Sequence, residues 1–334
     1  MRIHRLVLLP GLTSILSCAT VPPKAEVKPA VVLPPPQVVK MREPLEVTPL
    51  ELHFSGLRGA AKVTESVAIK NTSDQPVQVS DLRIVGTHAA TFSLVNLPLL
   101  PLVLAPSQSF SFSVGFAPPA DAELGVHHAR IRVVRTEDDD GPPCDLTGLV
   151  SKSREPGDEP PLAQVLDALG YDVDVGGTSL ALPAQSAGDQ VGVSLFQRAK
   201  PGNVGYYLMA RYSPAEDAQF GYYIVEGGKP APRAIGHASK ESNHTLNPEL
   251  ESGSHGSFDL GDVPFGLYLK VGQRTIHTDA RLNEGKPKGA ARVYPLLSRG
   301  RAPVPDAFVI VCDVDGDGDF QDYVFMLWNV RPGS

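Results

Sequence analysis

The stretch FSFSVGF at 110–116 alternates large apolar residues with serine or glycine, which is the period of a β-strand that buries one face. Shorter segments on either side repeat this alternation, and turn residues separate them. About seven such strands over roughly 100 residues predict an antiparallel β-sandwich, because each half-buried strand needs a second sheet to cover it. The expected inward positions are Leu50, Leu52, Phe54, Val67, Ile69, Val77, Val79, Leu82, Ile84, Phe110, Phe112, Val114 and Phe116.

Residues 45–151 also resemble a known class of domain, the ASH or choice-of-anchor-D type of immunoglobulin-like domain, which is similar to hydin and to major sperm protein. The resemblance rests on an opening strand, an Asn-Thr turn, a Leu-x-Pro segment, a Val-x-Phe-x-Pro strand and a closing Leu-x-Gly. The matching residues are Pro49, Leu52, Phe54, Asn71, Thr72, Leu104, Pro106, Ser109, Val114, Phe116, Pro118, Leu146 and Gly148, with Ser107 where the family usually has glycine. The resemblance implies a binding or spacer module rather than a catalyst.

A charged, proline-bearing linker is predicted at 152–161, followed by a second all-β unit over 162–334. Leu162, Val165, Leu166 and Leu169 have the spacing of a short amphipathic helix that ends before Gly170. The segments after it read as strands rich in tyrosine and glycine, and they predict a jelly-roll-like sandwich. The chain's 32 prolines and 31 glycines favour this all-β class over a helical one.

The N-terminus has the features of a targeting segment. A basic start and an apolar run too short to span a bilayer occupy 1–17 and predict a signal peptide. The sequence ILSC at 15–18 resembles the lipobox of bacterial lipoproteins, which implies lipidation of Cys18 and a location in the bacterial cell envelope, at the outer membrane or its periplasmic face. An ordinary secretory signal with a chance cysteine is the alternative. Residues 18–44 are rich in proline and predict an extended tether.

Charge and cysteine content narrow the function classes. The formal net charge is −7 and no cluster of basic residues is present, so the sequence does not support binding to nucleic acid. Besides Cys18, the chain has Cys144 and Cys312, and no CxxC pair supports a zinc or thioredoxin-type site. We expect both to be small buried residues, with a disulfide between them as the alternative.

The stretch CDVDGDGDFQDYVF at 312–325 is the strongest candidate site. Its first half matches the Asp-x-Asp-x-Asp-Gly start of an EF-hand loop, but Val324 stands where the bidentate glutamate would be. A structural Ca²⁺ site is predicted, and an exposed Asp-Gly hairpin turn is the alternative. The predicted ligands are Asp313, Asp315, Asp317, Asp319 and Asp322.

The same C-terminal region resembles uncharacterised domains of bacterial surface proteins. The resemblance includes an F-G-x-Y strand and an acidic ending, D-x-D-F-x-D-x-V, in which Gln321 replaces the usual asparagine. It implies a fold and a surface location but no reaction.

The sequence therefore predicts a non-catalytic envelope lipoprotein that acts as a scaffold or binding module, with envelope proteins or surface glycans as partners and a lipid anchor in the membrane. A carbohydrate-binding module is one alternative, with an aromatic platform drawn from Tyr206, Tyr207, Tyr212, Tyr222 and Tyr223. A secreted hydrolase is the other; the serine, histidine and aspartate closest in sequence are Ser254, His255 and Asp259.

Overall fold

Strands dominate the protein. The computed structural model describes residues 43–333 except 137–138, 155–157, 184–186, 249, 251–254 and 284–289. Strands make up 53% of it, and α1 (Leu162–Ala168) is the one α-helix among the described residues. The predicted all-β sandwich fold with one short helix is therefore confirmed. The signal peptide, Cys18 and nearly all of the predicted tether lie outside the described residues.

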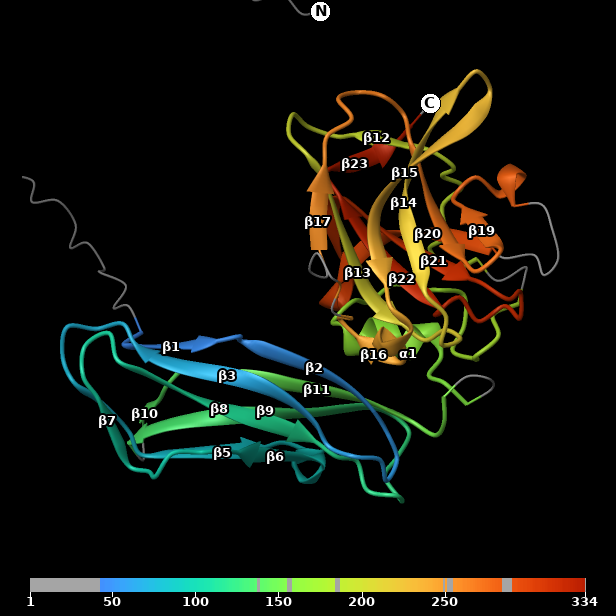
Figure 1. Ribbon diagram of the computed structural model, residues 1–334. Coiled ribbons are helices and arrows are strands. Elements are labelled where there is room, and N and C mark those ends of the chain that lie inside the picture. The colour runs from blue at the N-terminus through green and yellow to red at the C-terminus, as the bar shows by residue number, and fades with distance from the viewer. Residues whose placement is uncertain are drawn as a thin grey trace, which may run out of the picture. The chain divides into compact units, whose positions relative to one another are not determined.

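Residues 45–151 form the first sandwich, drawn in blue to green in Figure 1. One sheet has the order β1-β3-β8-β6, from Leu45–Thr48, Val63–Asn71, Ser109–Phe116 and Phe92–Val95. The other has the order β10-β9-β11-β2, from Asp139–Asp140, Gly125–Thr136, Cys144–Ser151 and Glu51–Leu57, with β5 (Asp81–Val85) also pairing with β9. A small third sheet joins β4 (Val77–Val79) to β7 (Leu102–Leu104). Strands β2 and β11 are parallel, and the other pairs of this sandwich are antiparallel.

Alternation along the strands builds the core of the first sandwich. Phe112, Val114 and Phe116 of β8 are buried, as the pattern of 110–116 predicts. The rings of Phe54, Phe92 and Phe116 meet with centroids 5.0–5.9 Å apart. The prediction for Leu50 is wrong: its side chain is 61% exposed, because β2 begins one residue later, at Glu51.

Helix α1 follows Pro161 and ends in a Schellman motif. Gly170, at φ +85°, donates its N–H to the Asp167 carbonyl over 2.9 Å, and Tyr171 donates to the Leu166 carbonyl over 2.9 Å. Glycine suits this position because side-chain-bearing residues rarely adopt a positive φ. The apolar face of the helix is fully buried and packs into a cluster with Tyr212 and other residues of the second sandwich. The predicted helix is confirmed.

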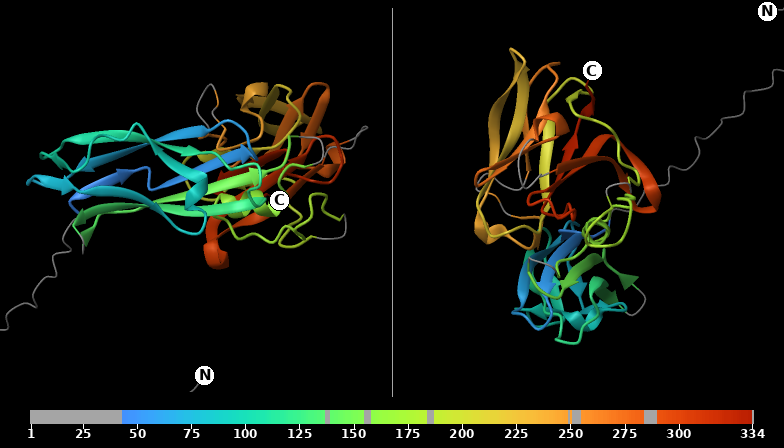
Figure 2. Two further views of the ribbon diagram at one scale, coloured as in Figure 1. Left: turned by 90° about the horizontal axis from the view of Figure 1, so that it is seen from below. Right: turned by 90° about the vertical axis from the view of Figure 1, so that its right-hand side faces the viewer.

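The second sandwich pairs two larger sheets. The first has the order β16-β13-β22-β21-β20, from Thr245–Leu246, Val204–Arg211, Tyr323–Trp328, Ala302–Asp313 and Ala290–Ser298, with β17 (His255–Phe258) also on β13. The other has the order β15-β14-β18-β19, from Lys229–Ala238, Ala218–Glu226, Gly266–Val271 and Arg274–His277. Strands β12 (Phe196–Arg198) and β23 (Val330–Pro332) form a separate pair. In the right-hand view of Figure 2, the yellow strands β14 and β15 lie in one layer and the red strands β21 and β22 in another.

Four short 3-10 helices complete the described elements. They are η1 (Ala89–Thr91), η2 (Lys240–Ser242), η3 (Ala280–Leu282) and η4 (Arg299–Arg301). The described residues contain no helix with the length and apolar character needed to cross a membrane.

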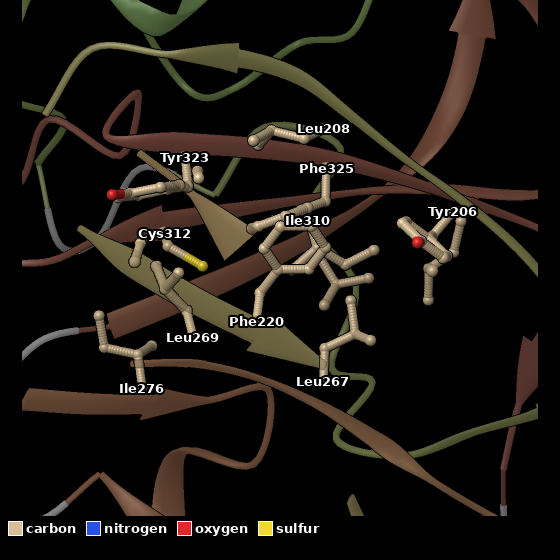
Figure 3. Close-up of a cluster of buried hydrophobic side chains, with 14 of the residues drawn as sticks. Tyr206, Leu208, Phe220, Leu267, Leu269, Ile276, Ile310, Cys312, Tyr323 and Phe325 are labelled. Carbon is tan, nitrogen blue, oxygen red and sulfur yellow. The ribbon is translucent and has the colours of Figure 1, made fainter. Parts of the chain in front are cut away.

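The space between the two large sheets is filled by apolar side chains. Figure 3 shows Phe220, Leu267 and Leu269 of one sheet meeting Ile310, Cys312 and Phe325 of the other. Cys312 lies in this core and Cys144 in that of the first sandwich, and both are free thiols, so the alternative of a disulfide between them is wrong. Burial raises the pKa of the Cys144 thiol to about 12 and also raises that of Cys312. Both thiols are therefore unreactive at neutral pH.

Residues 43–334 form one compact unit. Within the described residues, each strand pair joins two strands of 45–151 or two strands of 196–332. Side-chain contacts also cross the linker: the Tyr212 hydroxyl donates to the Ser55 hydroxyl over 2.8 Å. Whether the two sandwiches fold independently remains a prediction.

Candidate metal centre

The acidic loop at 314–322 connects β21 to β22, two neighbouring interior strands of the larger sheet of the second sandwich. It turns back onto the protein: Val314 and Phe320 are buried apolar residues within it. Of the five predicted ligands, Asp313 is 3% exposed, Asp319 1% and Asp322 0%. Only Asp315 and Asp317 have appreciable exposure. The carboxylates at the base of the loop are thus buried while its tip at Gly316 and Asp317 is exposed, and the calcium site and the plain turn both stay predictions.

Backbone hydrogen bonds from two glycines shape the tip of the loop. Gly316 and Gly318 have φ values of +84° and +93° and donate their N–H groups to the two carboxylate oxygens of Asp313, over 2.6 and 3.0 Å. The Asp317 side chain accepts from the Asp319 N–H over 3.2 Å. Glycine is needed at the two turning positions because a Cβ would oppose the positive φ. The Asp-x-Asp-Gly-Asp-Gly pattern therefore curls the chain around the Asp313 side chain.

Neighbouring segments hold the second half of the loop in place. Phe320 has φ +60°, uncommon for a bulky residue, and the Arg292 guanidinium lies 4.1 Å from the centre of its ring. The Gly318 carbonyl accepts from the Leu182 N–H over 2.8 Å. The Asp322 carboxylate accepts from the Val314 N–H over 2.5 Å, which closes the loop at its base. The loop is therefore fixed on several sides before any ligand binds.

The carboxylates gather in three overlapping groups. The members are Asp313, Asp315 and Asp317 in the first; Asp313, Asp319 and Asp322 in the second; and Glu159, Asp317 and Asp319 in the third. In each group, one oxygen from every residue lies within 4.8 Å of the others. Oxygens bound to one Ca²⁺ at 2.3–2.6 Å are at most about 5.2 Å apart, so this spacing fits a shared cation. The structure thus brings all five predicted aspartates together.

Glu159 joins the cluster from the segment predicted as a plain linker. It is buried, and an oxygen of its carboxylate accepts from the Asp158 N–H over 3.0 Å. Its sequence context of charges and prolines is typical of a solvated connection. No local pattern distinguishes this glutamate, because its role depends on contacts with residues about 160 positions later in the chain.

Burial and mutual repulsion perturb the acidity of two carboxyls. Burial, followed by the charges of Asp317 and Asp313, raises the pKa of Asp319 to about 8. Burial also raises the pKa of Asp313 to about 6, although the two glycine N–H bonds oppose it. At neutral pH the Asp319 carboxyl therefore holds a proton unless a cation replaces it, whereas Asp313 gains its proton only as the pH falls to about 6.

Three buried oxygens of the cluster have no hydrogen-bond partner within the described residues: Oδ1 of Asp315, Oδ1 of Asp319 and Oε1 of Gln321. Gln321 is fully buried, and its Nε2 donates to the other oxygen of Asp319 over 2.6 Å. Leaving a buried acceptor unpaired costs about 1–3 kcal/mol. An amide oxygen and a carboxylate oxygen left open beside buried aspartates are the ligand types that a hard cation takes.

The other sequence-predicted sites behave differently. Tyr206, Tyr212 and Tyr223 are buried, so a sugar platform made of all five predicted tyrosines is wrong. Ser254 lies outside the described residues. Asp259 caps the N–H of Gly261 over 2.9 Å and forms an ion pair with Arg198 at 3.6 Å. These contacts give Asp259 a structural role in its turn.

Comparisons with known proteins identify no family for this chain. No family model matches the chain, and no curated protein does. Among solved structures, the chain is similar to a family 123 glycoside hydrolase from Clostridium perfringens, with 13% identity and TM-score 0.26 over 32% of this chain and 24% of the hydrolase. It is similar to the ASH/PapD-like domain 7 of human CEP192, with 10% identity and TM-score 0.25 over 39% of this chain and all of that domain.

A third similar structure is the Escherichia coli chaperone DraB, with 10% identity and TM-score 0.25 over 69% of this chain and 91% of the chaperone. The solved structures that are similar to the chain thus include an ASH/PapD-like domain and a chaperone. Their identity and TM-scores are low, and they identify no activity.

Proposed function

We propose that this protein is a non-catalytic lipoprotein of the bacterial cell envelope, a scaffold or binding module whose second sandwich is stabilised by Ca²⁺ in the acidic loop. The observation that carries the calcium site is the buried carboxylate cluster with unpartnered acceptor oxygens on Asp319 and Gln321. An all-β sandwich fold is compatible with a binding or scaffold role.

The ligand set favours calcium over other cations. All of the grouped residues are aspartates or a glutamate, and neither histidine nor cysteine takes part in them. Zinc and copper prefer nitrogen and sulfur, whereas Ca²⁺ accepts six to eight oxygens in a flexible arrangement. Mg²⁺ demands an octahedron and keeps several waters. A crowded cluster of up to six carboxylates suits the larger ion.

Calcium would change the energetics of the loop in two ways. It would replace the proton that Asp319 otherwise retains at neutral pH, and it would give the open oxygens a partner. Extracellular modules bind Ca²⁺ with dissociation constants of about 10⁻⁴–10⁻³ M. At ten times the dissociation constant, binding to the folded state adds about 1.4 kcal/mol to the free energy of unfolding.

The envelope assignment rests on Cys18 and the segment after it. A proline-rich segment spans about 3.1 Å per residue, so residues 18–44 would let the sandwiches stand several nanometres from a membrane. Such reach suits a module that meets partners beyond a crowded membrane surface.

Metabolic labelling tests the anchor. The full chain expressed in a Gram-negative host should incorporate labelled palmitate, and Cys18→Ser should not. Cys144→Ser is the matched control, because Cys144 is buried in the first sandwich. Equal labelling of Cys18→Ser and the parent would contradict lipidation. Thermal melting in millimolar Ca²⁺ against chelator tests the loop, and equal melting temperatures would contradict a structural calcium site.

A further inference from the structure

A groove on the second sandwich lies around Trp328, the chain's one tryptophan and the last residue of β22. The groove has a volume of about 570 Å³, within the range usual for small-ligand sites. Met326, Leu296 and Val304 contribute apolar surface to it, and Lys200 and Asp306 contribute charged groups. None of these residues belongs to the acidic loop.

The indole of Trp328 is held against the sheet. It is 37% exposed, and its register partners are Gly205 on β13 and Ala307 on β21. A Cβ added at Gly205 would overlap three atoms of the indole, so the ring lies directly against the glycine backbone. Two small neighbours thus let a large aromatic ring lie over the strands, while part of it faces the groove.

The rim beside this ring is rigid and polar. The Asn329 side chain accepts from the Lys200 N–H over 2.9 Å and donates to the carbonyls of Lys200 and Asn203 over 3.1 and 3.0 Å. Asp306 and Asn329 have φ values of +58° and +61°. Residues with side chains adopt this region at a cost, and such positions cluster at ligand sites. The loop next to the indole is therefore fixed in advance of binding.

The charges of the groove balance. Lys200 Nζ lies 2.6 Å from an Asp306 carboxylate oxygen, and the lysine side chain is largely exposed. The pair offers both donors and acceptors without a net charge, so it gives no preference to an anion or a cation. A ligand that matches has an apolar face for the indole and hydroxyl groups that both donate and accept.

We infer that this groove binds a pyranose ring of a neutral glycan, with the ring stacked on Trp328 and its hydroxyls on Lys200 and Asp306. The inference gives the proposed binding module a ligand class and rests on that function for its biological meaning. The groove is separate from the acidic loop. Strand β22 begins at Tyr323, next to that loop, and ends at Trp328, and the five residue steps between them span about 17 Å.

The single tryptophan makes emission a direct readout. The full chain is titrated with cellopentaose, chitopentaose and maltopentaose, each to about 10 mM, so that dissociation constants of about 1 mM are within reach. At least one should shift or quench the emission saturably. Calorimetry with that sugar should show at least a tenfold loss of affinity in Trp328→Ala. Leu99→Ala, an exposed apolar change in the first sandwich, should bind as the parent does.

Lys200→Ala and Asp306→Ala serve as surface variants if Trp328→Ala fails to fold, and each should also weaken binding. No emission change with any of the three sugars would overturn the inference. So would unchanged affinity in Trp328→Ala, or an emission shift that follows protein concentration without sugar, which would identify a second copy as the occupant. If the parent binds none of the sugars but still melts at a higher temperature in Ca²⁺, the inference about the groove fails and the proposed calcium site stands.

Discussion

Replacing Asp319 by asparagine separates two effects of this residue on stability: the destabilisation from burying its carboxyl and the stabilisation from its role as a calcium ligand. The two side chains have nearly the same shape, so the packing around Phe320 should survive. In chelator, the substitution removes a carboxyl whose pKa is raised to about 8 by burial and by Asp317 and Asp313. With calcium, it removes a ligand from two of the three carboxylate groups. We therefore expect opposite effects in the two buffers.

The magnitude follows from the pKa. An unfolded aspartate loses its proton near pH 4, and the folded one near pH 8. At pH 7 this difference corresponds to about three pH units, or on the order of 4 kcal/mol. Neighbouring carboxyls share the repulsion, so about half, roughly 2 kcal/mol, is expected from one substitution. That should raise the melting temperature in chelator by about 4–8 °C.

The dependence on pH has a definite sign. Folding raises the pKa of Asp319, so the protonated carboxyl favours the folded, metal-free protein. This contribution to the free energy of unfolding is fully present below the unfolded pKa and is lost as pH rises through about 8. In chelator, the parent should melt lower at pH 8 than at pH 5.5, and Asp319→Asn should reduce this difference. In millimolar Ca²⁺, the variant should lack the calcium-induced rise that the parent shows.

Differential scanning calorimetry in both buffers provides the assay, and Asp121→Asn, an exposed aspartate of the first sandwich, is the matched control. The control should respond to calcium as the parent does. A lower melting temperature for Asp319→Asn in chelator would refute the reasoning about buried charge. An undiminished response of the variant to calcium would refute the role of Asp319 as a ligand.

Three other predictions follow from packing, burial and chain exposure. Gly148→Ala should destabilise the first sandwich by about 1–3 kcal/mol, because the new Cβ would overlap the buried ring of Phe116; Gly115→Ala, whose nearest neighbour is a flexible lysine, should cost less, and equal melting temperatures would count against this. Burial lowers the pKa of His244 to about 4, so the free energy of unfolding should fall by up to about 3 kcal/mol as pH drops from 6.5 to 4. In urea titrations, the free energy of unfolding of His244→Asn should depend less on pH over this range. Trypsin should cut first at 152–154, where the chain is exposed, and leave two protected fragments; a single resistant core would contradict independent sandwiches.

The strands were predictable because period two is a local signal. In β8 the apolar positions of 110–116 point to the core, as the pattern indicates. The helix was equally readable from Leu162, Val165, Leu166 and the glycine that ends it. Leu50 was misassigned because the apolar alternation begins one residue before β2 does. Strand pairing, rather than hydrophobicity, sets the boundary of β2 at Glu51.

The candidate site was predictable only in part. Five aspartates on one short segment marked the loop, but the sequence alone did not show that Asp313, Asp319 and Asp322 are buried. Glu159 comes from a distant segment, and nothing local indicates it. The tyrosine-rich strands were interpreted wrongly because alternation does not say which side chains are covered: Tyr206 lies in the core and Tyr223 is also buried, whereas Trp328 reaches the surface.

Isothermal titration calorimetry of the chelator-stripped full chain with CaCl₂, alongside MgCl₂, tests the calcium site most directly. We expect saturable Ca²⁺ binding with a dissociation constant of about 10⁻⁴–10⁻³ M or tighter, weaker binding of Mg²⁺, and loss of the Ca²⁺ heat in Asp313→Asn, whose side chain belongs to two of the carboxylate groups. Absence of a calcium heat in the folded parent protein, at concentrations well above this range, would contradict the account.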